Sequence, residues 1–291
     1  LGTLFGAGPP APDVVVCDYA WPAAAAAEAL RTRGVPVLVN GRGSDVLQVR
    51  ETPGLEPHLA RGLRSSGGYT AVSQDLLDAM VATGGPKPVQ ALTPNGVDAD
   101  HFKPGERRAA RARLGQATEG DLVLCVGHLI ERKDPLLALA AFAAGATEGA
   151  RLVFVGRGPL SDAVEGAAAE LGLGDRVSLL GERPPAELVD WYRAANLLLL
   201  TSRREGRPNV VLEALSTGCP VLATSAGGTG ELLEDPRMLS MDRESAALGQ
   251  MLKDLLKRPP AAEVLRRSVE PLTWAASLDA LESALLSVSR A

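Results

Sequence analysis

Aromatic residues are scarce in this sequence, at 3% of 291 residues. Lectins and single-stranded nucleic-acid binders stack their ligands on aromatic rings, so either kind of surface would have few residues to build it. A basic excess is also lacking, because the formal net charge is −5 and no long basic run occurs. Nucleic-acid binders normally carry a basic patch that neutralises phosphates. The composition therefore argues against a lectin and against nucleic-acid partners.

Cysteines and long apolar runs are few as well. Cys17, Cys125 and Cys219 are odd in number, lie far apart, and each sits in or beside an apolar run. This pattern is typical of buried thiols in a reducing compartment, without a disulfide framework or a zinc site. No uninterrupted apolar stretch approaches the ~20 residues that span a bilayer. We therefore expect a cytoplasmic protein, in which peripheral membrane contact is allowed but not indicated.

What the sequence does contain is a regular alternation of short apolar runs with amphipathic helical stretches. This alternation predicts an α/β fold with parallel sheets built from βαβ units, and the length favours two domains. Strands are predicted over 13–17, 36–39, 69–73, 90–93, 122–127, 151–156, 176–180, 196–201 and 220–224. The clearest predicted helices are 22–33, 74–82, 135–144, 160–171 and 208–217. A Gly- and Pro-rich break over 84–93 predicts a linker between the domains.

The stretch most informative about chemistry follows the apolar run that ends at Thr201. It contains Glu205 and Glu213, and it opens a predicted helix with Pro208 near the first position. A helix that starts just past the carboxyl end of a parallel strand offers free N–H groups and a positive dipole end, which suits a phosphate. Taken alone, the two acids could equally be one loop carboxylate and one helix-surface carboxylate. Their spacing gives no support for a glycosidase pair, since eight helical residues rise about 12 Å.

Five ordered motifs carry a family resemblance. The segment Glu205–Glu213, with the following Ala214–Val221, resembles the Glu-x7-Glu element of glycosyltransferase family 4, whose retaining enzymes have the GT-B fold. Four further segments resemble this family's other motifs, and together they are far more specific than any one alone. They are Thr93-Pro94-Asn95-Gly96-Val97-Asp98, Val126-Gly127-His128-Leu129-Ile130-Glu131-Arg132-Lys133, Val155-Gly156-Arg157-Gly158-Pro159 and Gly227-Gly228-Thr229-Gly230-Glu231.

The resemblance implies two Rossmann-like domains that face a cleft. It divides the chain into a partial acceptor-side domain over 1–92, a nucleotide-sugar domain over 93–270, and a closing helix over 271–291 that packs back on the first domain. The family's opening strand and its Gly-rich loop are expected to be missing before Leu1.

The resemblance also implies an activity in glycan biosynthesis. A hexose would move from a nucleoside diphosphate sugar, UDP- or GDP-linked, to the hydroxyl of a glycan, lipid or small-molecule acceptor, with retention of configuration and without a metal or other cofactor. Two alternatives stay open: a non-catalytic nucleotide-sugar-binding module, and an epimerase or phosphorylase on the same fold. Turnover of a donor sugar would separate the enzyme from the module.

The site residues follow from the same resemblance. Lys133, Glu205 and Arg42 are the expected catalytic residues, with Lys133 on the leaving diphosphate and Glu205 on the transferred sugar. Glu213 matches the residue that accepts hydrogen bonds from the ribose hydroxyls. The other expected donor-binding residues are His128, Gly206, Arg207, Pro208, Asn209 and Val210.

Three positions depart from the family pattern. His128 stands where the family has Arg, so it either donates a hydrogen bond to phosphate or is a structural histidine. Asp134 replaces a Gly and is predicted to cap the helix that begins at Pro135. Arg42 occupies the position of a His in the segment 40–45, where a structural turn with Asp45 capping a helix is the competing interpretation.

Two further patterns suggest other ligands but carry little weight. Asp98 and Asp100 form an Asp-x-Asp pair, which binds metal in the other glycosyltransferase fold, but here we expect solvated loop carboxylates. Gly156 and Gly158 follow a strand, as in a dinucleotide site, but Ser161 occupies the place of the third glycine.

Overall fold

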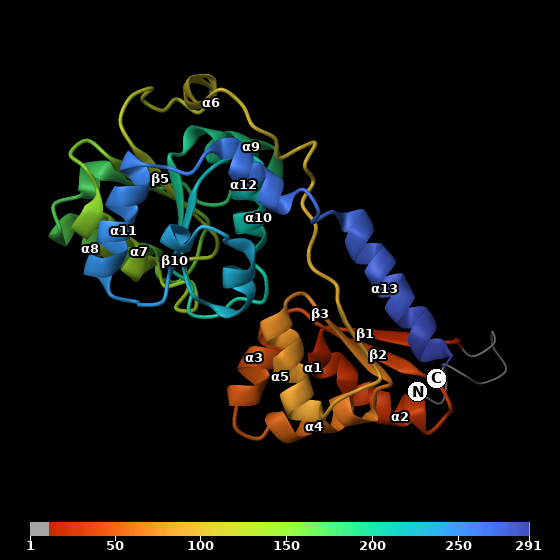
Figure 1. Cartoon of the computed structure of the whole chain (residues 1–291). Coiled ribbons are helices and arrows are strands. Elements are labelled where there is room, and N and C mark those ends of the chain that lie inside the picture. Colours follow the sequence, from red (N-terminus) through yellow and green to blue (C-terminus); the bar gives the residue numbers. More distant parts are fainter. Residues whose placement is uncertain (1–11, 291) are drawn as a thin grey trace. The chain divides into compact units, whose positions relative to one another are not determined.

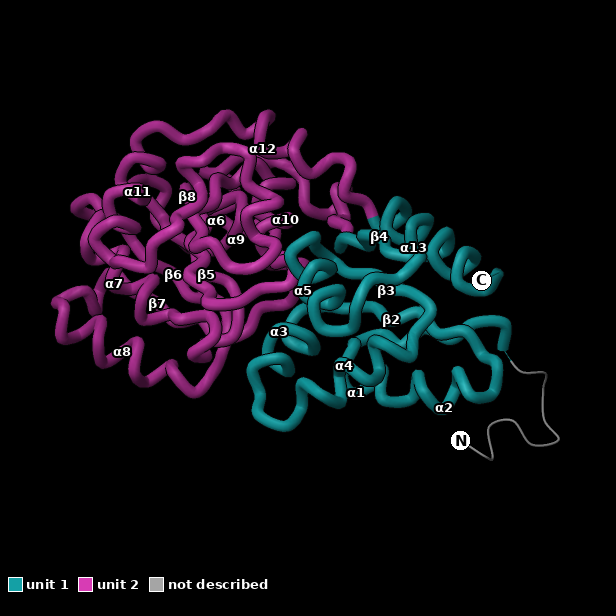
Figure 2. Tube along the Cα trace, turned by 60° about the horizontal axis from the view of Figure 1, so that its bottom comes forward, with its two compact units in different colours: residues 1–95, 274–291 teal, residues 96–273 magenta. Residues whose placement is uncertain are grey.

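The computed structural model describes residues 12–290. These residues form two compact units, one made of residues up to Asn95 together with those from Trp274 onward, and the other of Gly96–Thr273 (Figure 2). The observed boundaries lie a few residues beyond 92/93 and 270/271. Parallel sheets alternate with helices in both units, so the predicted α/β class is confirmed.

Unit 2, Gly96–Thr273, is built on a six-stranded parallel sheet. Its strand order is β10-β9-β8-β5-β6-β7, so the chain starts at the centre with β5, builds outward to β7, and then returns to the other side of β5. The order therefore reverses between β5 and β8, as in doubly wound nucleotide-binding sheets. The strands are β5 (Leu122–Val126), β6 (Arg151–Val155), β7 (Val177–Leu179), β8 (Leu197–Leu200), β9 (Val221–Thr224) and β10 (Leu239–Ser240).

Two groups of helices flank this sheet (Figure 1). One group contains α7 (Pro135–Gly145), α8 (Ser161–Glu170) and α11 (Ser245–Lys257), in which α7 packs on both of the others. The second group contains α6 (Arg107–Arg113), α9 (Pro185–Ala194), α10 (Asn209–Ser216) and α12 (Ala262–Val269), which contact one another in the order α6-α9-α10-α12. Short 3-10 turns complete the unit: η2 (Gly174–Arg176), η3 (Gly227–Leu232) and η4 (Pro236–Met238).

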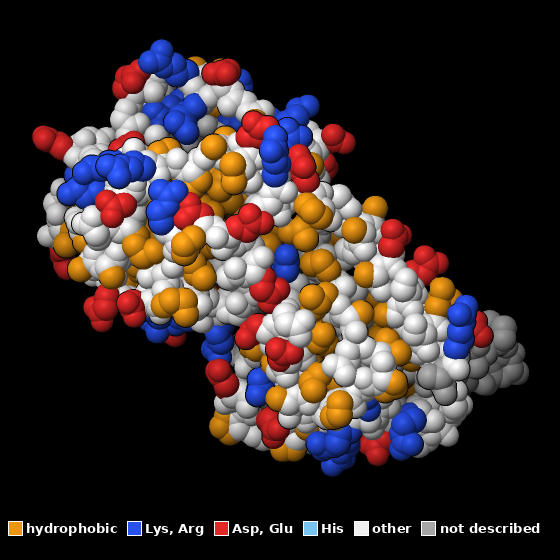
Figure 3. Space-filling view, in the orientation of Figure 1, with side chains coloured by type: hydrophobic (Ala, Val, Ile, Leu, Met, Phe, Trp, Pro, Cys, Tyr) orange, Lys and Arg blue, Asp and Glu red, His pale blue; other side chains and the backbone are white. Residues whose placement is uncertain are grey.

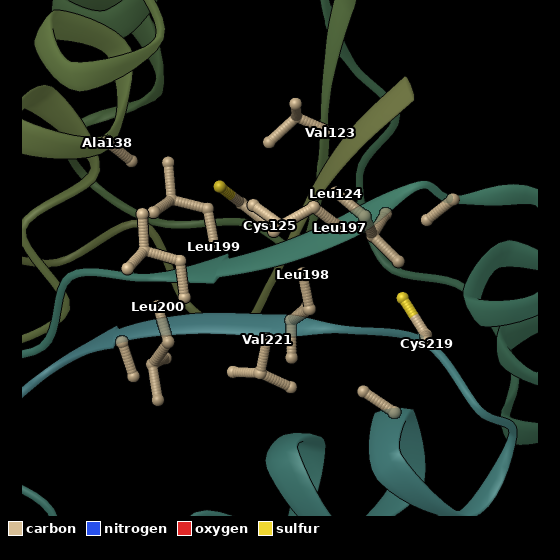
Figure 4. Close-up of a cluster of buried hydrophobic side chains, with 14 of the residues drawn as sticks. Val123, Leu124, Cys125, Ala138, Leu197, Leu198, Leu199, Leu200, Cys219 and Val221 are labelled. Carbon is tan, nitrogen blue, oxygen red and sulfur yellow. The ribbon is translucent and has the colours of Figure 1, made fainter. Parts of the chain in front are cut away.

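The apolar runs of the sequence become the centre of unit 2. All four residues of β8 are buried leucines, because helices cover both faces of the sheet. Cys125 and Cys219 lie among these aliphatic side chains, as Figure 4 shows. Burial raises the pKa of the Cys219 thiol to about 12. The predicted buried thiols are confirmed, and Cys17 of unit 1 is also buried and free.

Two basic side chains of α6, Arg111 and Arg113, have structural partners. Figure 3 shows Lys and Arg gathered over this helix. Arg111 is 2% exposed, and its guanidinium donates to the carbonyl oxygens of Ala194, Thr118 and Gly120 and to Oδ1 of Asn196. Arg113 forms a two-point ion pair with Asp190. The charges of these two arginines are therefore satisfied within unit 2.

Unit 1 has a four-stranded parallel sheet in the order β1-β2-β3-β4, with helices on both faces. Along β2, Val37 and Val39 face the main helical layer, whereas Leu38 faces α13 on the other side (Figure 1). This alternation is the period-2 pattern of a strand covered on both faces. The strands are β1 (Val15–Asp18), β2 (Val37–Gly41), β3 (Gly68–Ala71) and β4 (Val89–Leu92). The helices are α1 (Ala20–Ala23), η1 (Ala24–Ala26), α2 (Ala27–Arg31), α3 (Ser44–Glu51), α4 (Glu56–Ser65), α5 (Gln74–Gly84) and α13 (Trp274–Ser289).

The structure corrects two sequence predictions in unit 1. The helix predicted over 22–33 is three short pieces, α1, η1 and α2, and Trp21 has extended dihedral angles. Gly62 of α4 packs against the backbone of Ala24, an approach that a side chain would block. The segment 84–93 is not a linker, because it contains β4, which pairs with β3 along its length.

None of the helices formed by residues 12–290 is long and apolar enough to cross a membrane.

Candidate functional site

Two loops of unit 2 meet at the point where the strand order reverses. The loop 127–134 connects β5 to α7, and the loop 201–208 connects β8 to α10. In open α/β sheets, ligands bind at this switch point, outside the carboxyl ends of the strands. The amino-terminal ends of α7 and α10 both follow these loops, so the positive dipole ends of both helices lie at this point. The arrangement favours an anionic ligand.

Lys133 and Glu205 form the central contact between the loops. Nζ of Lys133 lies 2.6 Å from Oε1 of Glu205, and Oγ of Ser202 donates to the same oxygen over 2.6 Å. Nη1 of Arg132 lies 3.5 Å from Oε2. Glu205 is only 7% exposed, so its charge needs these partners. The backbone of Arg203 also donates to the carbonyl oxygen of Arg132 over 2.7 Å, which joins the loops directly.

Asp134 forms a second charged contact beside the first. Its Oδ2 lies 2.7 Å from Nη2 of Arg203 and 2.7 Å from Nη2 of Arg243. Its Oδ1 accepts from the backbone N–H of Leu137, so the prediction that Asp134 caps α7 is confirmed. We call the six residues of these two contacts the loop cluster. It holds the cations Arg132, Lys133, Arg203 and Arg243 and the carboxylates Asp134 and Glu205.

The loop cluster has more positive than negative charge. Its four cations exceed its two carboxylates by two unit charges, although the whole chain carries −5. The excess lies beside two helix amino termini, whose dipoles have the same sign. A ligand with two negative charges, such as a diphosphate, would balance this excess.

Glu213 lies on α10 and is held from α9. The hydroxyl of Tyr192 donates to Oε2 of Glu213 over 2.6 Å. Burial raises the pKa of Glu213, while the hydrogen bond from Tyr192 and the charge of His101 act to lower it. Tyr192 is fully buried, and burial together with the Glu213 carboxylate raises the pKa of its hydroxyl well above the usual value. The hydroxyl is therefore a permanent donor to Glu213.

Glycines allow the loop after β5 to pack on the loop after β6. Gly156 has φ of 144° and lies against the carbonyl of Gly127, and Gly158 lies against the backbone of Leu129. The N–H of Leu129 donates to the carbonyl oxygen of Arg157 over 2.9 Å. A side chain at 156 or 158 would displace the loop that carries Lys133. Loop packing thus explains these two glycines without a dinucleotide.

The family described as "Glycosyl transferases group 1" matches residues 106–270. The chain belongs to this family. The resemblance to glycosyltransferase family 4 is thereby confirmed, and the matched residues include the whole loop cluster.

Curated relatives of the chain are named D-inositol 3-phosphate glycosyltransferase. That of Frankia alni is 37% identical over 198 residues, which cover 64% of this chain and 47% of the relative. The relative from Catenulispora acidiphila, D-inositol 3-phosphate glycosyltransferase 1, is 30% identical over 259 residues, which cover 81% of this chain and 62% of the relative. The chain thus spans about half the length of the curated relatives it matches.

Solved glycosyltransferase structures share the fold. Sucrose-phosphate synthase from Thermosynechococcus elongatus has a TM-score of 0.81 at 23% identity, covering 96% of this chain and 74% of that one. The Anabaena protein HepE in complex with UDP has a TM-score of 0.75 at 21% identity, covering 92% of this chain and 75% of that one. The GT-B type expected from the sequence is confirmed.

The site residues that the family resemblance predicts in unit 2 have different environments in the structure. Lys133 and Glu205 touch each other, whereas His128 is exposed and lines a cavity of about 20 Å³ that Lys133 also lines. Glu213 lies in the second turn of α10 with Tyr192 as its partner. The remaining predicted residues, Gly206, Arg207, Pro208, Asn209 and Val210, form the end of the loop and the start of α10.

Contacts with η3 fix the end of that loop. The carbonyl oxygen of Gly206 accepts from the N–H of Gly228 over 3.1 Å. Nη1 of Arg207 lies 3.2 Å from Oε2 of Glu231. The motif Gly227–Glu231 therefore supports the loop that precedes α10.

Arg42 belongs to unit 1 and follows β2. Asp45 accepts hydrogen bonds from the backbone N–H groups of Ala20, Arg42 and Gly43. The prediction that Asp45 caps a helix is wrong in detail, because Asp45 lies inside the first turn of α3 and the cap position is Gly43. Asp45 instead fixes the backbone of the loop that presents Arg42.

The Asp-x-Asp pair is part of a turn. Oδ1 of Asp98 accepts from the backbone N–H groups of Asp100 and His101, and both aspartates are exposed. Within residues 12–290, no group of three His, Cys, Asp or Glu side chains is placed to hold a metal ion.

Tyr192, Ser202 and Arg243 were not predicted from the sequence. Ser202 directly follows the apolar run that ends at Thr201, and a small donor three residues before Glu205 is the signal that could have indicated it. Tyr192 reaches the site from α9 and Arg243 from the segment that precedes α11, and no local pattern distinguishes them.

Proposed function

We propose that this chain is part of a retaining glycosyltransferase that moves a hexose from a nucleoside diphosphate sugar to an acceptor hydroxyl, without a metal ion. The observation that carries the proposal is the net positive loop cluster between the amino-terminal ends of α7 and α10. A diphosphate supplies the matching charge at the position where this sheet class binds ligands.

In the proposed reaction, the bond between the anomeric carbon and the diphosphate oxygen breaks. A bond forms between the anomeric carbon and the acceptor oxygen, and the acceptor proton passes to the leaving diphosphate. Negative charge thus grows on the diphosphate. The Lys133 ammonium stabilises that charge when it is shared between Glu205 and the phosphate oxygens, and fixed charges of this kind cost no reorganisation during the reaction.

The two glutamates have separate roles in this proposal. Glu213 accepts hydrogen bonds from the ribose hydroxyls, and Glu205 contacts the transferred sugar. Glu205 is supported by Lys133 and Ser202, so its carboxylate is oriented before a substrate arrives. Glu213 lies in α10, the helix that directly follows the loop. His128 and the backbone N–H groups of Gly206, Arg207, Asn209 and Val210 would hold phosphate and sugar oxygens, and Pro208, which has no N–H group, would shape the turn between them.

The relatives indicate which substrates to test first. The HepE structures contain UDP and UDP-glucose, so UDP-glucose is the first donor. The curated relatives are named for D-inositol 3-phosphate, so this is the first acceptor. Arg42 supplies a cation on the acceptor-side unit, which suits a phosphorylated acceptor. Three free, buried thiols support a reducing, cytoplasmic site of action.

Binding of UDP, GDP and ADP, measured by calorimetry, tests the donor site. We expect one nucleotide to bind, and we expect Glu213→Gln and Lys133→Met each to weaken its binding about tenfold or more, a loss of about 1.4 kcal/mol. Glu165→Gln on α8 and Lys253→Met on α11 are the matched controls, because both side chains are exposed. Failure of all three nucleotides to bind, or equal effects of site and control variants, would refute the donor assignment.

Turnover tests the chemical step. Release of UDP from UDP-glucose should require an acceptor, and it should continue in excess EDTA. Loss of turnover in EDTA would refute the metal-independent reaction. Nucleotide binding without turnover of any donor would instead favour a binding module.

A further inference from the structure

We propose that Tyr192 is a positioning residue for the donor, because its hydroxyl fixes Glu213 in the orientation that receives the ribose. This inference rests on the proposed role of Glu213 as the ribose ligand. Tyr192 itself touches no substrate in this proposal and acts only through the glutamate.

The ring of Tyr192 is held rigidly. Its exposed fraction is 0%, and its centroid lies 6.0 Å from that of Phe102 in an edge-on contact. The carbonyl of Phe102 accepts a hydrogen bond from Oγ of Ser216, which anchors Phe102 to α10. On the next residue of α9, Nε of Arg193 donates to the carbonyl oxygen of Lys103 over 2.8 Å. The hydroxyl therefore has a fixed position relative to the helix that carries Glu213.

The hydrogen bond leaves the glutamate able to bind a diol. An ionised carboxylate offers about four lone-pair sites on two oxygens. Tyr192 occupies one site on Oε2, which leaves Oε1 and the rest of Oε2 for two hydroxyl donors. Without the Tyr192 hydroxyl, the Glu213 carboxylate can rotate. Nucleotide binding must then fix its orientation, and the lost conformational entropy weakens the affinity.

The same hydroxyl also favours the charged form of Glu213. Burial raises the pKa of Glu213, and the groups whose interactions lower it are Tyr192 from α9 and His101 from the loop before α6. Cys219 acts on Tyr192 rather than on Glu213. Removing the hydroxyl removes a lowering contribution, so the pKa of Glu213 should rise. Affinity that depends on ionised Glu213 should then be lost at a higher pH than in the wild type, while His101 is present in both proteins.

Tyr192→Phe tests the proposal with minimal disturbance, because it removes one hydroxyl and leaves the ring. Tyr69→Phe is the matched control, since Tyr69 is equally buried and its hydroxyl donates to the carbonyl oxygen of Leu63 in unit 1 over 3.1 Å. Affinity is measured between pH 4.5 and 8 for whichever of UDP, GDP and ADP binds the wild type most tightly, and for its 2′,3′-dideoxy analogue. Urea unfolding of each variant establishes that it is folded under the binding conditions.

We expect Tyr192→Phe to weaken the ribonucleotide about three- to tenfold at pH 7 and to move the loss of affinity in acid to higher pH. The dideoxy analogue should bind both proteins equally, because it cannot use Glu213. Tyr69→Phe should change neither quantity. The double variant Tyr192→Phe/Glu213→Gln should bind no more weakly than Glu213→Gln alone.

The outcomes separate this inference from the proposed function. If Glu213→Gln weakens binding but Tyr192→Phe behaves like Tyr69→Phe, Tyr192 is not a positioning residue and the donor assignment stands. If Tyr192→Phe weakens both nucleotides equally with no change in the pH profile, its role is only structural and the inference is overturned. If Glu213→Gln binds as tightly as the wild type, the ribose role of Glu213 and this inference both fail.

Discussion

Oδ2 of Asp134 lies 2.7 Å from Nη2 of Arg243, which is 109 residues further along the chain. The same guanidinium donates to the carbonyl oxygens of Thr201 and Ser202 over 2.9 and 2.8 Å. Asp134 has φ of 50°, a left-handed conformation that is uncommon for residues other than glycine. One arginine therefore ties a helix cap with unfavourable backbone geometry to the end of β8, and both loops of the candidate site depend on this contact.

Arg243→Met should destabilise the protein, because it leaves two carbonyl groups and a carboxylate without this donor. We expect a loss of about 2 kcal/mol in the free energy of unfolding in urea. A double-mutant cycle with Asp134→Asn should give a coupling of about 1 kcal/mol, and strict additivity would contradict the pairing. Arg237→Met is the matched control, since Arg237 is half-exposed in a surface ion pair with Asp235, and it should cost less than about 1 kcal/mol.

Gly156→Ala should be strongly destabilising. Its φ of 144° disfavours a side chain, and a methyl group would collide with the backbone of Gly127. We expect a loss of about 2 kcal/mol or more in thermal or urea unfolding. Gly166→Ala is the informative comparison, because a methyl there has no neighbour within 4 Å and the residue lies inside α8. That variant should be more stable than the wild type by about 0.5–1 kcal/mol, and a loss of stability would contradict the description of this helix face.

Tyr69 should make the stability of unit 1 sensitive to alkali. Burial raises the pKa of its hydroxyl to about 12, against about 10 in the unfolded chain. As the pH rises, the unfolded state therefore loses the Tyr69 proton first. The contribution of Tyr69 to the free energy of unfolding is complete below about pH 10 and disappears as the pH rises through about 12. The difference in unfolding free energy between the wild type and Tyr69→Phe should fall by at most about 3 kcal/mol over this window. Tyr19→Phe is the control, since that ring is 54% exposed, and a similar slope there would contradict the assignment.

The three cysteines should be unreactive in the native protein. Cys17, Cys125 and Cys219 are buried and free, and burial raises the pKa of each thiol. Because the thiolate is the reactive form, an aromatic disulfide reagent at pH 8 should label none of them within minutes and all three in urea. Rapid labelling of even one thiol without urea would show that its surroundings open.

The apolar runs predicted the sheets well because covered parallel strands need continuous burial. Leu197–Leu200 illustrates this, since all four residues are buried and the predicted strand differs by one residue at each end. The helix predicted over 22–33 is divided in the structure, because alanines satisfy any helical register and the close approach of Gly62 to Ala24 decides the local path. Helix α3 was expected only in the alternative interpretation in which Asp45 caps a helix, because its polar sequence has little apolar periodicity.

The sequence predicted those parts of the candidate site that lie within a single strand-loop-helix unit. Lys133 and Glu205 were expected at one ligand, and they lie in contact because β5 and β8 are neighbours at the switch point. Tyr192 and Arg243 could not be found this way. Each acts on the site through a contact that exists only after distant segments have packed, and a buried tyrosine or a loop arginine has no distinctive spacing in the chain.

The helix α13 gives unit 1 an unusual dependence on the order of synthesis. Its residues Ala284 and Val288 bury Leu38 on the face of the sheet opposite to the main helical layer, yet they are made only after all of unit 2. Unit 2 is continuous in the chain, whereas unit 1 takes its last helix from beyond unit 2. A chain that ends before residue 274 would therefore lack the side chains that bury Leu38, and an apolar residue left exposed in this way marks a protein for chaperones and proteases.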